Sequence, residues 1–358
     1  MKNIFEIMND VNCLIGMGNF EHAAERFLEV LQVSPDFAWN SLWGQTPWAF
    51  YEQLVPFFQA DFENIHVRSR IACINTLLNR DMNKDALALI PKLESILPGD
   101  PLALEMYARA HAGLGHFYTA LQYAERIEAV TPDTGEYFDA EYSPRQANPL
   151  QLFKLWCYFE LGEDDEFEAL IGELIASNPN QSDLYLHKSF WLRDCGRYQE
   201  GLAAAEKALS LRRSSIAWFQ KGWFNRIFNP NAAIQDFKAF FAAPPSPESP
   251  YYSPFVYTYI GQAAQARRSM MDYLSKYPND SNALYLCSEI YSLLGESEMA
   301  IDCLEQAIKK GLVSRAGLYA DPALKSVRDT PEGKELIMNH LRTLEREDMR
   351  AAREMNYC

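Results

Sequence analysis

The sequence predicts an all-α fold in which antiparallel helix pairs stack side by side into a right-handed superhelical solenoid. Marker residues recur at one spacing of 34 residues, in the pairs Pro98 and Pro132, Ala86 and Ala120, and Gly162 and Gly196. Apolar residues three and four positions apart fill the segments between these markers, which is the pattern of a helix with one buried face. A period of this length is typical of helix–turn–helix repeats, and the chain has room for about 8–10 such pairs.

Individual repeats follow the chain in a recognisable order. Seven segments carry the pattern most clearly: residues 4–35, 67–98, 101–132, 148–179, 182–213, 215–243 and 281–312. A glycine such as Gly115 ends the first helix, because a left-handed cap is easiest without a Cβ. A small residue such as Ala120 then lets the two helices approach, and a proline such as Pro132 ends the second helix. Asp81 replaces the turn glycine in the second segment, and Phe167 replaces the small residue in the fourth.

These segments predict the domain organisation. We expect a first repeat at residues 1–36, a divergent aromatic-rich helix pair at 37–65, two repeats at 66–132, an acidic insertion at 133–147, three repeats at 148–243, a proline-rich loop with an irregular helix pair at 244–280, the last repeat at 281–312, and a capping segment with a charged helix at 313–358. The insertions are interpreted either as parts of a binding surface or as tolerated surface loops.

The prolines between residues 243 and 254 predict a loop, since a helix does not continue through such a cluster. The charged run from Leu341 to Met355 is expected to be a solvated capping helix, with an oligomerisation helix as the alternative.

The repeat marks resemble those of the tetratricopeptide repeat (TPR) family. They include Gly18-Asn19-Phe20, Gly196-Arg197-Tyr198 and the alanines that follow them, while Asp321-Pro322-Ala323-Leu324 resembles the tail that closes the stack in many TPR proteins. The resemblance implies that the first helix of each repeat lines a concave groove. It also implies a non-enzymatic scaffold or adaptor that binds other proteins.

Charge and composition exclude several classes of partner. Lys and Arg number 33 against 48 Asp and Glu, so the formal net charge is −15. Nucleic acids and anionic membranes are bound by concentrated basic residues, so we expect neither as a partner. No apolar stretch of about 18 residues occurs, as a membrane-spanning helix would require. The seven cysteines form no Cys-x-x-Cys pair and are odd in number, which favours reduced thiols and a cytoplasmic location.

Motifs for catalysis or cofactor binding are missing from the sequence. It contains neither of the glycine-rich nucleotide-binding motifs, no Gly-x-Ser-x-Gly elbow and no His-Glu-x-x-His zinc motif. His111 and His116 are five residues apart and straddle a helix end, which places them on different faces. We therefore expect no metal, no cofactor and no enzymatic activity.

The TPR resemblance points to a set of groove residues. The ninth repeat position reads Asn75, Arg109, Trp156, Phe190 and Trp223, the arginines three positions later are Arg193 and Arg226, and the residues flanking them on the same side are Phe153, His187 and Phe219. An aromatic ladder beside arginines suits a peptide or protein segment with apolar anchors and an acidic group.

Other interpretations of these residues remain open. Trp156 and Trp223 could fill gaps between adjacent first helices, and Arg193 could form an ordinary salt bridge with a neighbouring acid. A functional alternative to the scaffold is a peptide-responsive regulator that controls an effector. The sequence does not identify the partner.

Overall fold

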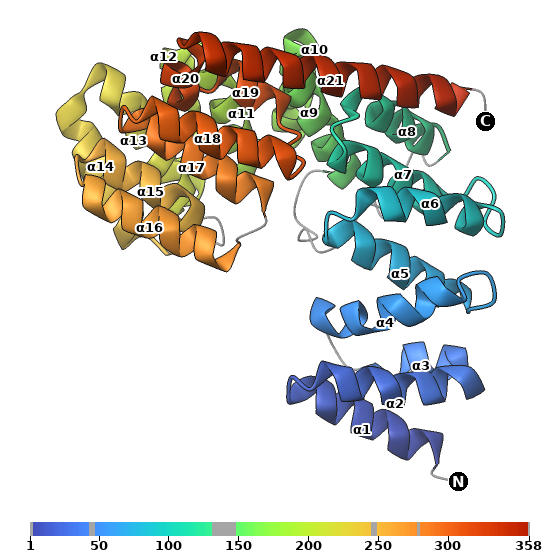
Figure 1. The fold of residues 1–358 in the computed structure, drawn as a ribbon. Coiled ribbons are helices and arrows are strands. Elements are labelled where there is room, and N and C mark those ends of the chain that lie inside the picture. The colour runs from blue at the N-terminus through green and yellow to red at the C-terminus, as the bar shows by residue number, and fades with distance from the viewer. Residues whose placement is uncertain (1–2, 43–46, 131–147, 245–248, 278–279, 357–358) are drawn as a thin grey trace. The chain divides into compact units, whose positions relative to one another are not determined.

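A computed structural model describes the chain except for residues 1–2, 43–46, 131–147, 245–248, 278–279 and 357–358. All regular structure in the described residues is helical, and most helices follow one another as adjacent pairs (Figure 1). The predicted all-α class of stacked helix pairs is therefore confirmed. The chain divides into two compact units, residues 1–114 with 122–133 and residues 115–121 with 134–358. The acidic insertion predicted at 133–147 lies outside the described residues.

The first unit is a stack of helices around one aromatic-rich core. Its helices are α1 (Ile4–Gly16), α2 (Phe20–Val33), α3 (Pro35–Asn40), α4 (Trp48–Ala60), α5 (Val67–Asn79), α6 (Asn83–Glu94), α7 (Pro101–Gly113) and the greater part of α8 (Phe117–Val130). Helix α4 packs against α2 and α5. Phe27 of α2 meets Phe50 of α4 edge to face, with ring centroids 5.5 Å apart, and both rings are fully buried. Phe50, Phe58 and Phe62 of segment 37–65 thus supply core.

The second unit contains five helix pairs followed by a C-terminal segment. The pairs are α9 (Pro149–Leu161) with α10 (Asp164–Ser177), α11 (Ser182–Asp194) with α12 (Tyr198–Leu211), α13 (Ser215–Phe228) with α14 (Pro230–Ala242), α15 (Ser249–Tyr259) with α16 (Ala263–Lys276), and α17 (Ser281–Leu293) with α18 (Ser297–Lys309). The first helices of neighbouring pairs touch in the order α11, α13, α15 and α17. This packing puts one face of each first helix on a shared inner wall.

The chain after the last pair folds back onto the first pair of this unit. It forms α19 (Arg315–Ala320), the 3₁₀ helix η1 (Pro322–Leu324), α20 (Lys325–Arg328) and α21 (Pro331–Asn356). Helix α19 contacts α9, while η1 contacts α17. The segment from Ser314 to Leu324 therefore reaches both ends of the row of pairs.

Asp81 adopts the left-handed backbone conformation that its position in the repeat requires. Its φ is +56°, and among the described residues other than glycine only Asp81 has a positive φ. Gly115, at the equivalent position of the next repeat, has φ +76°. The turn therefore demands the left-handed region, and Asp is one of the few residues with a side chain that tolerates it.

The proline-rich segment is partly helical, which corrects the loop expected up to residue 254. Helix α15 already begins at Ser249 and includes Pro250 and Pro254. Pro250 lies in the first turn, where a missing N–H leaves no hydrogen bond unmade. Pro254 does lose an intrahelical bond, but its side chain is buried, and this burial offsets part of the loss.

The C-terminal helix α21 is longer than the charged run suggests and has a buried side. Asp348 is only 2 % exposed. Its carboxylate accepts hydrogen bonds from the backbone N–H groups of Tyr118 at 2.9 Å and Thr119 at 3.0 Å, and it forms an ion pair of 3.0 Å with Arg315. The carboxylate thus caps the first turn of α8, where unpaired N–H groups favour a negative charge.

The six described cysteines are free, and Cys358 lies outside the described residues. Three of the thiols are buried, and burial raises the pKa of Cys73 and of Cys287 to about 12, so neither is a reactive thiolate at neutral pH. In the described part of the chain, no helix combines the length and the apolar character needed to cross a bilayer.

Candidate functional site

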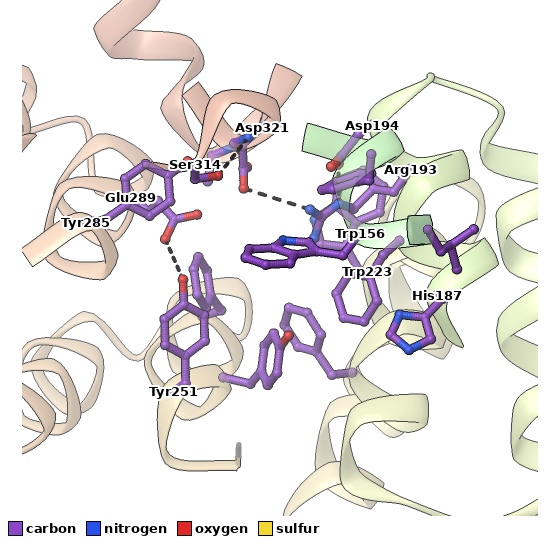
Figure 2. Close-up of a pocket in the computed structure, with 18 of the residues that line it drawn as sticks. Trp156, His187, Arg193, Asp194, Trp223, Tyr251, Tyr285, Glu289, Ser314 and Asp321 are labelled. Atoms are coloured by element: carbon purple, nitrogen blue, oxygen red, sulfur yellow. Dashed lines mark hydrogen bonds and ion pairs between the residues drawn. The ribbon is translucent and has the colours of Figure 1, made fainter. Parts of the chain in front are cut away.

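The inner wall of the second unit encloses a cavity of ≈ 360 Å³. Most of the lining comes from the first helices α9, α11, α13, α15 and α17, and the rest from α10 and from the segment Ser314–Ala323 (Figure 2). The lining residues are Leu152, Leu155, Trp156, Phe159, Phe167, His187, Phe190, Arg193, Asp194, Phe219, Trp223, Tyr251, Tyr252, Phe255, Tyr259, Tyr285, Glu289, Ser314, Gly317, Asp321 and Ala323.

Aromatic rings form most of the cavity wall. Phe219 and Trp223 are almost fully buried, at 2 % and 3 % exposed, and Phe219 contacts Tyr252 with centroids 4.7 Å apart. Trp156 differs, because 41 % of its surface remains exposed. Its ring meets Phe117 edge to face at 5.1 Å. The wall is thus a packed aromatic surface with one large ring that stays partly exposed.

His187 lies on the side of the view opposite Tyr285 and Glu289 in Figure 2. It is exposed to solvent, yet surrounding protein atoms limit the hydration of its ring and lower its pKa below the ordinary value. A neutral imidazole at neutral pH can donate or accept one hydrogen bond at this side of the cavity.

Arg193 is the one arginine among the described residues that line the cavity, no lysine is among them, and the charge of Arg193 is already paired. Its Nε donates to Asp194 Oδ1 at 2.7 Å, and its Nη2 lies 3.8 Å from Asp321 Oδ2. The guanidinium also lies over the ring of Phe190, 5.4 Å from the centroid. The salt-bridge interpretation of this arginine therefore describes the structure, and little of its charge is available for an acidic ligand.

Glu289 and Tyr285 form a buried polar end of the cavity on α17. Glu289 is 2 % exposed and accepts a hydrogen bond of 3.1 Å from the Tyr251 hydroxyl. Burial, then the nearby Asp321 charge and a hydrogen bond with Asp321, raise the pKa of Glu289 well above its ordinary value. The Tyr285 hydroxyl has no hydrogen-bond partner among the described residues, and Tyr285 is 6 % exposed.

Glu160 fixes two walls of the cavity at once. Its carboxylate accepts from the backbone N–H groups of Arg315 at 2.7 Å and Ala316 at 3.1 Å, which open helix α19. The same carboxylate accepts a hydrogen bond from Trp156. Burial nevertheless raises the pKa of Glu160, because desolvation outweighs these hydrogen bonds. The exposed tryptophan and the C-terminal segment are therefore held by one side chain.

Six of the ten groove residues predicted from the sequence line this cavity. They are Trp156, His187, Phe190, Arg193, Phe219 and Trp223. The alternative in which a tryptophan fills a gap between adjacent first helices fits Trp223, which is buried. It does not fit Trp156, whose ring is partly exposed.

The structure does not bring the other four predicted residues into the cavity. Phe153 packs against Trp156 from outside the lining, with centroids 6.0 Å apart, and Arg226 lies 3.9 Å from the centroid of Tyr259. Asn75 and Arg109 lie in the first unit, where Arg109 Nη1 donates to Asn75 Oδ1 at 3.2 Å. Their side chains satisfy one another instead of facing the cavity.

Sequence reasoning missed the acidic end of the cavity. Glu289 is the ninth residue of the repeat at 281–312, the same position that gives Trp156 and Trp223, so the register could have found it. No comparable signal exists for Ser314, Gly317 and Asp321, because they follow the last repeat. As a separate observation, the described residues contain no group of three His, Cys, Asp or Glu side chains placed to hold a metal ion.

Comparison with known proteins supports the repeat interpretation directly at one place. A tetratricopeptide repeat family model matches residues 281–309, which form α17 and α18. No curated protein matches the chain.

Several solved structures are similar to the chain. One is a tetratricopeptide repeat protein from Parabacteroides merdae, with 14 % identity, coverage of 96 % of this chain and 98 % of that one, and a TM-score of 0.45. Another is Cut9–Hcn1, described as an APC/C heterotetramer. It is 12 % identical, the match covers 92 % of this chain and 55 % of that one, and the TM-score is 0.45. A third is a thermophilic TPR protein from Thermus thermophilus. It is 17 % identical, the match covers 55 % of this chain and 99 % of that one, and the TM-score is 0.41.

The match to Cut9–Hcn1 spans just over half of that chain's length, and identities this low concern the fold alone. The family match, by contrast, falls on a helix pair whose geometry is repeated along both units. Turn residues with positive φ recur between the helices of these pairs, at Gly18, Asp81, Gly115, Gly162 and Gly196 among others. On these grounds residues 281–309 form a tetratricopeptide repeat, within a fold of stacked helix pairs.

Proposed function

We propose that this chain is a non-enzymatic protein-interaction scaffold whose second unit binds a segment of a partner protein in the aromatic cavity. TPR proteins in general are protein-interaction scaffolds, and that coarse assignment follows from the family. The cavity as the binding site for a peptide is the finer proposal. It is supported by walls that come from successive first helices, the helices expected to line the groove.

Trp156 is the observation that carries this proposal. A tryptophan with 41 % of its surface exposed, beside a preformed aromatic cavity, has apolar area to bury on binding. Tryptophan is enriched among the residues that dominate binding energy at protein interfaces, where truncation costs about 2 kcal/mol or more. Because the ring is already held by Phe117 and Glu160, little ordering remains to oppose binding.

The cavity volume sets the form of the ligand. A space of ≈ 360 Å³ lies near the lower limit of ordinary ligand pockets, which begin at about 300 Å³. It can hold one or two side chains, but not a long folded segment. We therefore propose that an anchor side chain enters the cavity while the rest of the partner segment lies across its opening.

Trp156→Ala tests the site. Crosslinking in the native cell followed by mass spectrometry would identify the partner segment, and its affinity as a synthetic peptide would be measured by fluorescence anisotropy. We expect the variant to bind at least about 30-fold more weakly, the equivalent of 2 kcal/mol. Tyr319→Ala is the matched control, because Tyr319 is a 76 % exposed aromatic residue that does not line the cavity. Equal affinity for wild type and Trp156→Ala would refute the assignment.

A peptide-responsive regulator is the second candidate, and one observation favours it. Gly317, Asp321 and Ala323 form part of the cavity wall, so a ligand there would contact the segment that leads into α21. Ligand binding would then change hydrogen exchange in α19 and α20 as well as around the cavity. Exchange protection confined to the first helices would favour the simple scaffold.

Further properties remain proposals of the same kind. We propose a cytoplasmic location, as the reduced thiols suggest, and partners other than nucleic acids or membranes, as the net charge of −15 suggests. Self-association through the C-terminal helix is the less favoured proposal, because Ile337, Leu344 and Ala352 of α21 are already buried within this chain.

A further inference from the structure

We propose that the polar end of the cavity, formed by Tyr285, Glu289 and Asp321, binds a primary ammonium group, which a lysine side chain of the partner segment would present. The lysine as the source of the ammonium rests on the proposed function. The binding of an ammonium group at this end of the cavity does not. It replaces the acidic ligand group expected from the arginines in the sequence.

The charge on the cavity lining favours a cation. Three carboxyl groups line it, those of Asp194, Glu289 and Asp321, against the single guanidinium of Arg193. That guanidinium is held by Asp194 at 2.7 Å and lies 3.8 Å from Asp321. Even with a proton on Glu289, the carboxylates of Asp194 and Asp321 outnumber this guanidinium, so an entering carboxylate would be repelled and an entering cation attracted.

The acceptors at the polar end match the three donors of an ammonium. One acceptor is the carboxyl group of Glu289, whose partner from the opposite helix is the Tyr251 hydroxyl. A second is Asp321, whose Oδ1 accepts from the backbone N–H of Ala323 at 2.6 Å and whose Oδ2 lies 3.8 Å from Arg193 Nη2 and has room for a further donor. The third is the Tyr285 hydroxyl.

Tyr285 distinguishes this place from an ordinary acidic cluster. Its side chain is 6 % exposed and its hydroxyl has no partner among the described residues, although it lines the cavity. A buried hydroxyl without a partner costs free energy, about 1–3 kcal/mol. Tyr285 and Glu289 are four residues apart on α17 and so lie on one face. An ammonium between them would satisfy the hydroxyl.

The aromatic wall suits the rest of a lysine side chain. Tyr251, Tyr252 and Phe255 of α15 line the cavity beside the polar end and offer ring faces to a chain of methylene groups. Ring faces of this wall do accept cations, because Arg193 lies 5.7 Å from the centroid of Trp223. A four-carbon stem with a charged head therefore fits both surfaces.

The ionisation of Glu289 links binding to pH. Burial and Asp321 raise the pKa of Glu289, which favours the protonated carboxyl when no ligand is bound. The other titratable groups that face it are Tyr251, Tyr285 and Arg193. An ammonium stabilises the carboxylate, so the proton leaves to solvent on binding. Affinity should then rise with pH, by at most tenfold per unit, until Glu289 is already ionised without ligand. Protonation of His187 in acid would act in the same direction.

The first experiment uses three small probes of one chain length on the full-length protein. Calorimetry would measure binding of n-pentylammonium chloride, 1-pentanol and sodium pentanoate. We expect the ammonium to bind at least tenfold more tightly than the alcohol, with proton release, and the carboxylate to bind most weakly. Equal binding of the ammonium and the alcohol, or tighter binding of the carboxylate, would overturn the inference.

Variants locate the ammonium. Glu289→Gln should weaken n-pentylammonium binding at least tenfold and remove proton release, while Tyr285→Phe should weaken it about threefold. Glutamine can still accept from Tyr251 and donate to Asp321, so the variant should fold. Glu305→Gln is the matched control on the next helix, since Glu305 is exposed and pairs only with Lys309 at 2.8 Å. Unchanged affinity in Glu289→Gln would contradict the site.

A peptide pair separates this inference from the proposed function. The probes are an acetylated peptide amide with one lysine between two leucines and the same peptide with norleucine. Selective binding of the lysine peptide supports both proposals. Equal binding of both peptides, lost in Trp156→Ala, overturns the ammonium site and leaves the peptide site standing. Glu289-dependent binding of n-pentylammonium with neither peptide bound supports the ammonium site with a free amine as its ligand, and counts against the peptide proposal.

Discussion

Glu289 illustrates how a single repeat position changes its chemistry along the chain. At the ninth residue of their repeats, Trp156 and Trp223 give the cavity its aromatic character, while Glu289 gives it a buried carboxyl group. The helix geometry is the same in each case, so all three side chains point to the inner wall. What differs is the cost of desolvation. Burial at 2 % exposure is unfavourable for the charged carboxyl group of Glu289, whereas burial of an aromatic ring is favourable.

Glu289→Gln is expected to make the protein more stable at neutral pH. The folded protein keeps on Glu289 a proton that the unfolded chain releases above its ordinary pKa of 4.5. Stability therefore falls as pH rises from about that value towards the raised pKa, by about 1.4 kcal/mol for each unit of the shift. Glutamine has no proton to lose and avoids this cost.

Urea denaturation of both proteins at several pH values measures the effect. The variant should exceed the wild type in free energy of unfolding at about pH 7, and the difference should shrink towards about pH 4, where both states of the wild type hold the proton. A wild type that is more stable than the variant at pH 7 would mean that Glu289 is ionised and well paired.

Among the helices, α19 and α21 show how two carboxylates hold the C-terminal segment in place. Glu160 of α9 caps α19, and Asp348 of α21 caps α8. Both accept backbone N–H groups at the start of a helix, where the unpaired donors and the helix dipole favour an anion. Gly317 allows the close approach, because a Cβ there would lie 2.6 Å from the Tyr285 hydroxyl. Capping and a small residue thus position one wall of the cavity.

Asp348→Ala should lower the free energy of unfolding by about 3 kcal/mol, because it leaves Arg315 without its buried partner and two N–H groups without acceptors. Asp329→Ala is the control, since Asp329 and Lys325 form an exposed pair of 2.5 Å worth no more than about 0.5 kcal/mol. Urea denaturation compares the two variants. Equal effects would show that Asp348 is not an anchor.

At the scale of the whole molecule, the two compact units differ in what their helix stacks do. In the first unit, aromatic residues of segment 37–65 such as Phe50 and Phe58 are buried in the hydrophobic core. The second unit leaves an aromatic cavity, which its first helices and the segment Ser314–Ala323 line together. Function in our proposal therefore belongs to the second unit.

We expect the full chain to sediment as a monomer. The apolar side of α21 is covered within the chain, with Leu344 and Ala352 each 4 % exposed, and the exposed Met349 lies among charged residues such as Arg346 and Arg350. Sedimentation velocity at several concentrations measures this. A dimer that dissociates on Met349→Ser would instead support the oligomerisation helix considered from the sequence.

Prediction from sequence succeeded where the signal is local. The spacing of apolar residues and the turn marks located the helices, and the alignment of Asp81 with the turn glycines identified a residue that takes φ +56°. The ninth repeat position likewise gave Trp156 and Trp223. The sequence left the role of Arg193 open between ligand binding and a salt bridge, and no local pattern reveals that Asp321, 128 residues further along the chain, lies 3.8 Å from its guanidinium.

The amino-acid sequence by itself determined the helix pairs, because they follow from a periodic pattern within about 34 residues. Only the tertiary structure decided that Ser314–Ala323 closes the inner wall and that carboxyl groups outnumber the guanidinium there. That segment has no repeat to set its register, so its place depends on distant partners such as Glu160, which meet it only when the chain has folded.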